Sequence, residues 1–270
     1  MNDQNQNQHQ TTHAGGDFCD PQPLDQFYEV SWKRFVFPAI HRKGRVIVFC
    51  VALVLLILLG CFAPIWFVPV PLMVPLALFL FPLFVFGWYF FRNPERFPPD
   101  DERAILAPAD GLVCAIRTLV PPATLGIGSQ PLVRVSVFMS VFNVHVNRCP
   151  TSGRVCALTY HHGKFVNVAH KDSDDNERQE ICIERADGVK IGFVQIAGLV
   201  ARRIYCPLKL GDQVQAGAVF GLIRFGSRLD VYLPPQVLPM VLPGQTITAG
   251  ETILARLDEH ENSLNERTLS

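Results

Sequence analysis

The chain lacks an excess of charge of either sign, since its 270 residues include 24 Lys and Arg and 24 Asp and Glu. Nucleic-acid-binding proteins usually carry a broad basic surface, and this balanced composition gives no reason to expect one. The eight cysteines contain no Cys-x-x-Cys pair, so no zinc or other metal site is expected. The N-terminal residues also lack the early apolar stretch of a secretory signal, and we therefore interpret the cysteines as reduced, cytosolic thiols.

Charge is absent altogether between Val46 and Phe91. Two apolar segments in this run each approach the roughly 20 residues that cross a bilayer core, and prolines crowd the join between them. Lys and Arg residues lie on both outer flanks and none lies in the join, which places both flanks in the cytoplasm. Residues 31–97 are thus predicted to form an α-helical membrane hairpin, and Pro75 and Pro82 leave a re-entrant form open beside a spanning one.

Helix-period patterns are nearly absent after this hairpin, where short alternating runs separated by Gly, Asp and Pro predict strands. These runs are residues 111–116, 132–138, 153–160, 181–185, 189–196, 213–217, 219–225 and 228–233. We therefore predict a mainly β domain over residues 98–270, of a β-sandwich or barrel-sandwich type. Residues 210–223 resemble the strand-turn-strand of lipoyl carrier domains, although Lys209 precedes the turn and does not fit a carrier's modified lysine. Residues 1–30 are polar and are predicted to be a disordered tail.

The dipeptide Gly226-Ser227 ends a β-patterned run. A serine hydroxyl oxygen lies close to the carbonyl carbon of the preceding residue, and glycine leaves that carbonyl sterically open. These are the requirements for an N→O acyl shift, in which a chain attacks its own backbone. The two residues alone are equally typical of a surface turn, so the surrounding pattern decides between the two interpretations.

Five segments, in order along the chain, resemble the short, bacterial and archaeal type of phosphatidylserine decarboxylase. They are residues 90–96 (FFRNPER), 107–111 (APADG), 137–150 (VFMSVFNVHVNRCP), 163–178 (GKFVNVAHKDSDDNER) and 208–234, which contains the Gly-Ser pair. The resemblance covers about residues 30 to 255. Five segments in the right order are far more specific than any one of them.

The resemblance implies a proenzyme that cleaves itself between Gly226 and Ser227, into a β chain of residues 1–226 and an α chain of residues 227–270. Ser227 would then become a pyruvoyl cofactor, whose ketone forms a Schiff base with the substrate amine. His145 is the candidate for proton transfer and Asp110 for orienting or stabilising it. The larger members of the family carry a second histidine where this chain has Arg148, so their full Asp-His-Ser arrangement is in doubt here.

The substrate phosphate needs a guanidinium or ammonium partner. Arg178, Lys164, Arg148 and Arg228 are the candidates, in that order of preference. The alternative for each is a surface residue that serves solubility, and for Lys164 the two interpretations are equally good.

Taken together, these features predict a carboxy-lyase of phospholipid biosynthesis that converts phosphatidylserine to phosphatidylethanolamine and carbon dioxide. Its two chains would form a heterodimer on the cytoplasmic face of the cell membrane, with a higher oligomer left open and no nucleic-acid partner. The alternatives are a membrane-anchored, non-enzymatic adaptor with a lipoyl-like domain, and a pyruvoyl enzyme that acts on a soluble amino acid. The adaptor does not explain the segments around Asp110, His145 and Arg178, and the membrane segment argues for a lipid substrate.

Overall fold

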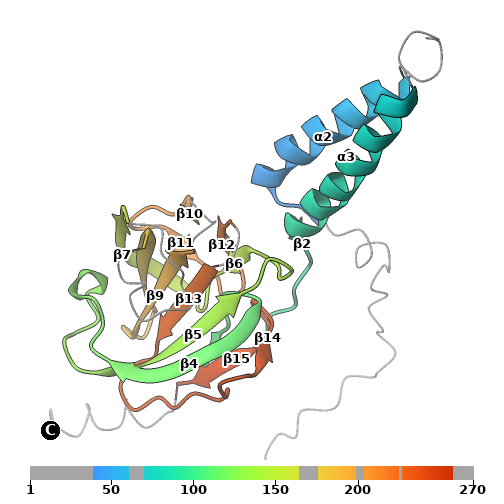
Figure 1. The fold of residues 1–270 in the computed structure, drawn as a ribbon. Helices are drawn as coiled ribbons and strands as arrows, with labels where there is room; N and C mark the ends of the chain where they lie inside the picture. Colours follow the sequence, from blue (N-terminus) through green and yellow to red (C-terminus); the bar gives the residue numbers. More distant parts are fainter. Residues whose placement is uncertain (1–38, 61–69, 164–175, 199–203, 225–226, 258–270) are drawn as a thin grey trace, which may run out of the picture.

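The computed structural model describes residues 39–60, 70–163, 176–198, 204–224 and 227–257. Two helices, α2 (Arg42–Gly60) and α3 (Val70–Phe90), come first and lie side by side (Figure 1). The described residues after Phe90 form strands and one short 3-10 helix, η1 (Ala123–Leu125). The predicted disordered tail, residues 1–30, lies outside the described residues.

The two packed helices lie over most of the uncharged run, whereas residues 61–69 between them lie outside the described residues and the predicted membrane hairpin stays a prediction. A short antiparallel ladder between β1 (Ala39–Ile40) and β2 (Arg92–Asn93) closes its base. Taken over its described residues, neither helix has the length and apolarity that crossing a membrane requires. The placement of this hairpin in a membrane, and the division of the chain at residue 97, stay predictions.

The largest sheet has eight antiparallel strands in the order β11-β7-β8-β9-β13-β5-β4-β14, and it curls around one side of the domain (Figure 1). Its strands are β4 (Gly111–Leu119), β5 (Leu132–Met139), β7 (Gly153–His161), β8 (Arg178–Glu184), β9 (Lys190–Ala197), β11 (Gln213–Val214), β13 (Ser227–Tyr232) and β14 (Thr246–Ile247). The β8–β9 hairpin turns at Gly188, whose φ of 81° requires the conformational freedom of glycine.

Smaller sheets complete the domain, and their strands are β6 (Val146–Arg148), β10 (Ile204–Tyr205) and β12 (Val219–Ile223) in one sheet and β3 (Ala104–Leu106) and β15 (Ile253–Arg256) in another. Each predicted run contains a strand, but β11 covers only the first two residues of the run 213–217, and residue 225 lies outside the described residues. The lipoyl-like stretch does contain a strand, a turn and a strand, but β11 and β12 join different sheets. Because the sheets are so unequal, the sandwich-like prediction is confirmed only in its coarser form, a mainly β domain.

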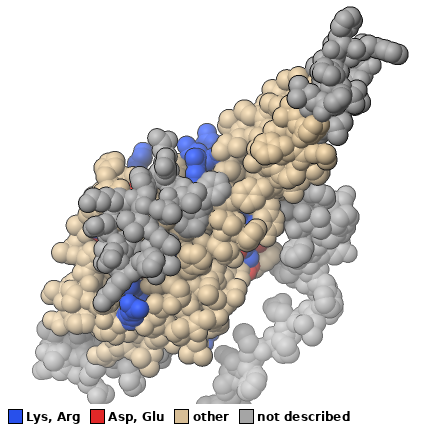
Figure 2. Space-filling view, in the orientation of Figure 1, with Lys and Arg blue, Asp and Glu red and all other residues tan. Residues whose placement is uncertain are grey.

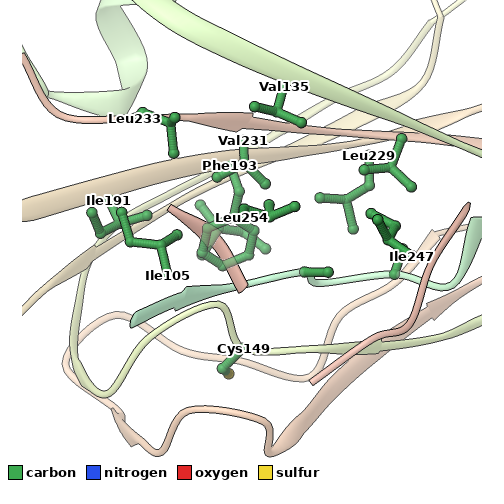
Figure 3. Close-up of a cluster of buried hydrophobic side chains, with 14 of the residues drawn as sticks. Ile105, Val135, Cys149, Ile191, Phe193, Leu229, Val231, Leu233, Ile247 and Leu254 are labelled. Atoms are coloured by element: carbon green, nitrogen blue, oxygen red, sulfur yellow. The ribbon is translucent and has the colours of Figure 1, made fainter. Parts of the chain in front are cut away.

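The main core lies between the curled sheet and the β3–β15 pair (Figure 3). Side chains alternate between the two faces of a strand, so Leu229 and Val231 of β13 enter this core together. Tyr232 faces the other way, into a separate cluster with Leu125 of η1. Ser227 shares the face of Leu229, and all six residues of β13 are buried.

Candidate functional site

Ser227 is the first residue of the central strand β13 and is completely buried. It lies opposite Ala197 of β9 on one side and opposite Met139 of β5 on the other. Its hydroxyl donates a weak hydrogen bond to the Met139 sulfur, with Oγ and Sδ 3.4 Å apart. The serine that the sequence singles out is therefore held rigidly between two strands and shielded from water, although Gly226 lies outside the described residues.

A tight turn carries the chain from Met139 to His145. The Asn143 side chain closes it, because Oδ1 accepts hydrogen bonds from both the backbone N–H and the hydroxyl of Ser140, each at 2.8 Å. The backbone oxygen of His145 then accepts from the N–H of Ile223 at 3.3 Å. Only four residue steps separate Ile223 from Ser227, so their Cα atoms lie at most about 14 Å apart. The turn thus places His145 beside the segment that leads into Ser227.

The His145 imidazole is buried and neutral. Burial is the main reason that its pKa falls from 6.5 to about 4; the Asn143 carbonyl opposes this and the Arg92 charge adds to it. Nδ1 lies 2.9 Å from that carbonyl oxygen, which can only accept, so Nδ1 carries the proton. Nε2 is left with a lone pair and is buried without a hydrogen-bond partner, while the Phe90 ring packs 4.2 Å away, centroid to centroid. This is the arrangement of a general base.

Asp110 precedes β4 and contacts neither His145 nor Ser227 by a hydrogen bond. Its Oδ2 accepts from Arg96 at 2.7 Å and its Oδ1 from the N–H of Ala249 at 2.8 Å. Burial raises its pKa, and the Arg96 charge partly offsets that effect. The following residue must be glycine, because a Cβ at Gly111 would collide with the carbonyl oxygen of Phe138. Asp110 is therefore anchored near the site through Arg96.

Arg148 holds the segment that joins the helices to the β domain. Its guanidinium donates to the carbonyl oxygens of Gly217 and Pro94 at 2.9 Å and to Asn93 Oδ1 at 3.0 Å. Three hydrogen bonds from a half-buried guanidinium make a structural tie, and substrate binding by Arg148 stays a prediction.

Two other predicted substrate residues, Arg178 and Arg228, lie on the opposite face of the sheet from Ser227. Arg228 immediately follows Ser227 in the strand, so its side chain points the other way, where it forms a bidentate pair with Asp230 at 3.0 and 3.1 Å. Arg178 is the register partner of Ile196, which in turn is opposite Arg228, and its Nε donates to Glu180 at 2.9 Å. The structure thus separates these arginines from the serine, and Lys164 lies outside the described residues.

Four residues that the sequence interpretation did not single out surround the site. Arg92 donates to the backbone oxygens of Tyr89 and Phe142 at 2.7 and 2.8 Å, and Arg96 holds Asp110. Asn147 and Gln195 are buried beside Ser227 and bonded to each other at 2.8 Å. Polar residues inside otherwise apolar strand runs were the available signal for this second pair, because such residues are rarely buried without a partner.

Comparisons with known proteins agree with the site. The sequence profile described as "Phosphatidylserine decarboxylase" matches residues 83–255. A phosphatidylserine decarboxylase proenzyme of Ruegeria pomeroyi is 60% identical over 176 residues, which cover 65% of this chain and 80% of that protein. The proenzyme of the same name from Cereibacter sphaeroides is 49% identical over 228 residues, which cover 84% of this chain and 93% of that protein. The one from Rickettsia conorii is 44% identical over 230 residues, which cover 82% of this chain and 91% of that protein.

Proposed function

The chain belongs to the phosphatidylserine decarboxylase family, and we propose that its cofactor is a pyruvoyl group made from Ser227 by self-cleavage of the preceding peptide bond. The activity is the decarboxylation of phosphatidylserine to phosphatidylethanolamine, a carboxy-lyase step of phospholipid biosynthesis. Family membership decides between this enzyme and the non-enzymatic adaptor, which no observation favours.

The observation that carries the proposal is the complete burial of Ser227 together with a buried, neutral His145, whose backbone bonds to Ile223, four residues before the serine. A serine hydroxyl is a weak nucleophile until a base removes its proton. His145 supplies a buried, unprotonated Nε2, and its backbone oxygen accepts from the N–H of Ile223, four residues before Ser227. When present, the pyruvoyl group would supply an electron sink for the electron pair that the substrate carbon keeps when carbon dioxide leaves. The buried position of Ser227 against Ala197 and Met139 would hold that group in a fixed orientation.

His145 has a second task in this proposal. After carbon dioxide leaves, the substrate carbon needs a proton, and the same imidazole can deliver one because its other nitrogen is held by the Asn143 carbonyl. A neutral imidazole that first accepts and later returns a proton needs no permanent charge in the site. Arg92, whose charge already lowers the pKa of His145, helps the imidazolium lose its proton again.

We propose that the helix pair attaches the enzyme to the cytoplasmic face of the cell membrane. Large apolar side chains are exposed along both helices, among them Phe49, Leu56, Leu78 and Phe79, with 64–69% of each accessible. Figure 2 shows the pair without charged side chains along most of its length and with basic side chains near its base. Exposed apolar surface of this extent marks a site of contact with lipid or protein. The basic residues at the base suit the anionic lipid headgroups of that face.

A cavity between the helices supports a lipid substrate. It has a volume of about 180 Å³ and is lined by apolar side chains of α2 and α3, among them Val48 and Phe90, with Arg224 at one side. Phe90 also packs on His145, so one side chain lines the cavity and contacts the proposed base. A soluble amino acid would have no use for such a lining, whereas an acyl chain would.

The experiment that tests the cleavage is an intact mass measurement on the purified, active chain. We expect two chains, one that ends at Gly226 and one that begins at residue 227. The second chain should lack a free amine and should react with hydroxylamine-type carbonyl reagents. Ser227→Ala should leave a single inactive chain, because it removes the attacking oxygen. An active preparation that contains only the uncut chain would refute the proposal.

A further inference from the structure

Ser227 belongs to a buried polar group whose other members have no role so far. Met139 Sδ lies 3.4 Å from Ser227 Oγ and 3.7 Å from Asn147 Nδ2. Asn147 Oδ1 in turn accepts a hydrogen bond from Gln195 Nε2 at 2.8 Å. All four side chains are completely buried, and they come from the four strands β5, β6, β9 and β13.

The hydrogen bonding of this group is poor for a purely structural cluster. A thioether is a weak acceptor, yet it is the acceptor for both the Ser227 hydroxyl and the Asn147 amide. Gln195 Oε1 is buried and has no hydrogen-bond partner within the part of the chain that the structure describes. Apolar side chains of similar shape would fill the same space at least as favourably, because a buried polar atom without a partner destabilises the fold. These costs favour a role in the reaction at Ser227.

The orientation of the two amides is fixed by the neighbouring strand. Gly221 of β12 is the register partner of Asn147. A Cβ at this position would approach Gln195 Nε2 to 3.1 Å and the backbone oxygen of Tyr205 to 2.6 Å. The glycine therefore lets β12 pass close against Gln195, and the Gln195 amide in turn holds the Asn147 amide with its Nδ2 directed toward Met139 Sδ, which also accepts from Ser227.

We propose that Asn147 is the hydrogen-bond donor that stabilises the oxyanion of self-cleavage, with Gln195 as the residue that positions it. The proposal rests on the cleavage proposed above. Ser227 Oγ forms a bond to the carbonyl carbon of the preceding peptide, and the carbonyl electron pair moves onto its oxygen. That pair then returns, the C–N bond breaks, and the hydroxyl proton ends on the departing nitrogen, which leaves an ester.

The weak bonds to Met139 suit this role. The reacting carbonyl carbon is covalently attached to Ser227 N, so the oxyanion of the proposed step develops two bonds from an atom of Ser227. The Asn147 amide gives up only a weak hydrogen bond when its N–H turns from the Met139 sulfur. In exchange it forms a stronger, charge-assisted hydrogen bond to the new oxyanion. Asn147 therefore makes a strong hydrogen bond only while the oxyanion exists. An interaction that is stronger in the transition state than in the ground state lowers the barrier.

The test follows the appearance of the two chains after synthesis of the full-length protein, on a denaturing gel. Removal of one oxyanion donor typically slows a reaction about 100- to 1,000-fold, and we expect a loss of that order for Asn147→Asp, which keeps the shape but removes the N–H. Gln195→Leu should slow cleavage less, because it removes only the positioning contact. Gln179→Leu is the matched control: Gln179 is a buried glutamine on β8 in register with Gln195, and its amide donates to the backbone oxygens of Thr159 and Glu180.

Hydroxylamine identifies the step that is affected, since it cuts an ester but leaves a peptide bond intact. We expect the uncut Asn147→Asp chain to resist it, because the ester does not form. Cleavage of that chain by hydroxylamine, wild-type processing of Asn147→Asp, or an equal loss in Gln179→Leu would each overturn the proposal. Absence of cleavage in the wild type would overturn the proposed function and this inference together, whereas the other outcomes leave the proposed function standing.

Discussion

At the scale of the residue, the chemistry depends on one proton position. His145 has its Nδ1 proton fixed by the Asn143 carbonyl and its Nε2 bare, so the ring is a base and not an acid in the resting protein. Asp110, expected to orient it, is instead held by Arg96 and by the Ala249 N–H. The carbonyl of a neighbouring turn therefore does for His145 what a carboxylate does in a serine-protease-like relay.

The depressed pKa of His145 makes stability depend on pH. The folded pKa of about 4 lies below the ordinary 6.5, so the unfolded chain binds more protons between these values. Its contribution is complete above pH 6.5 and is lost as the pH falls toward 4, by about 1.4 kcal/mol per pH unit and about 3 kcal/mol at most. Thermal unfolding of the Ser227→Ala chain at pH 7 and pH 5 should therefore show a larger drop than the same chain with His145→Gln. Equal drops in the two proteins would contradict the buried, neutral state of the histidine.

At the scale of the element, the segment after α3 ties the helix pair to the site. Phe90 packs on His145, Arg92 donates to Phe142 in the turn before it, and Arg96 holds Asp110. Arg148 binds Asn93 and Pro94 in the same segment. The helix pair therefore cannot be removed without affecting the β domain. A truncation at Pro98, the predicted domain boundary, would remove the contacts of Phe90, Arg92 and Arg96 described above.

Point substitutions test membrane attachment without this damage. Leu56 and Phe79 are 64% and 69% exposed, so replacing both with Glu should leave folding and self-cleavage intact. Burying two carboxylates in lipid is costly, and we expect the double variant to lose most of its binding to anionic vesicles in a sedimentation assay. Leu238→Glu is the control, because Leu238 is 76% exposed but belongs to the β domain. If the helix variant still sediments like the wild type, the attachment lies elsewhere.

At the scale of the whole molecule, cleavage before Ser227 would leave the fold with two chains and an uninterrupted core. The second chain contributes β13, which is paired on both sides with β9 and β5, and also β14 and β15. Leu229, Val231 and Leu254 from it are buried in the main core (Figure 3). Twelve register pairs around one central strand make separation equivalent to unfolding.

The cleaved enzyme should therefore behave as one body. We expect the chains of residues 1–226 and 227–270 to elute together in size-exclusion chromatography in detergent, with the retention volume of the uncut Ser227→Ala protein. They should part only in denaturant, in the same transition that unfolds the domain. Recovery of the short chain alone under native conditions would show that β13 is held less firmly than its burial indicates.

Sequence by itself determined the local features of this protein. The alternating runs predicted the strands because residue alternation matches the pleat whatever the partner strand is. The uncharged run predicted the helix pair, and Gly226-Ser227 at the end of a strand pattern marked Ser227 as the candidate for self-cleavage. Alternation could also have shown that Arg228 turns away from Ser227, since neighbours in a strand face opposite sides.

Tertiary structure decided which residues meet. Met139, Asn147, Gln195 and Ser227 lie on four strands whose pairing is set by burial of the whole core, so no spacing in the chain links them. The ion pair of Asp110 with Arg96 also depends on the folded structure. So does the position of Arg178, which lies on the opposite face of the sheet from the serine. Strand register is the sum of many weak contacts across the sheet, and that sum is a property of the folded molecule and not of any segment.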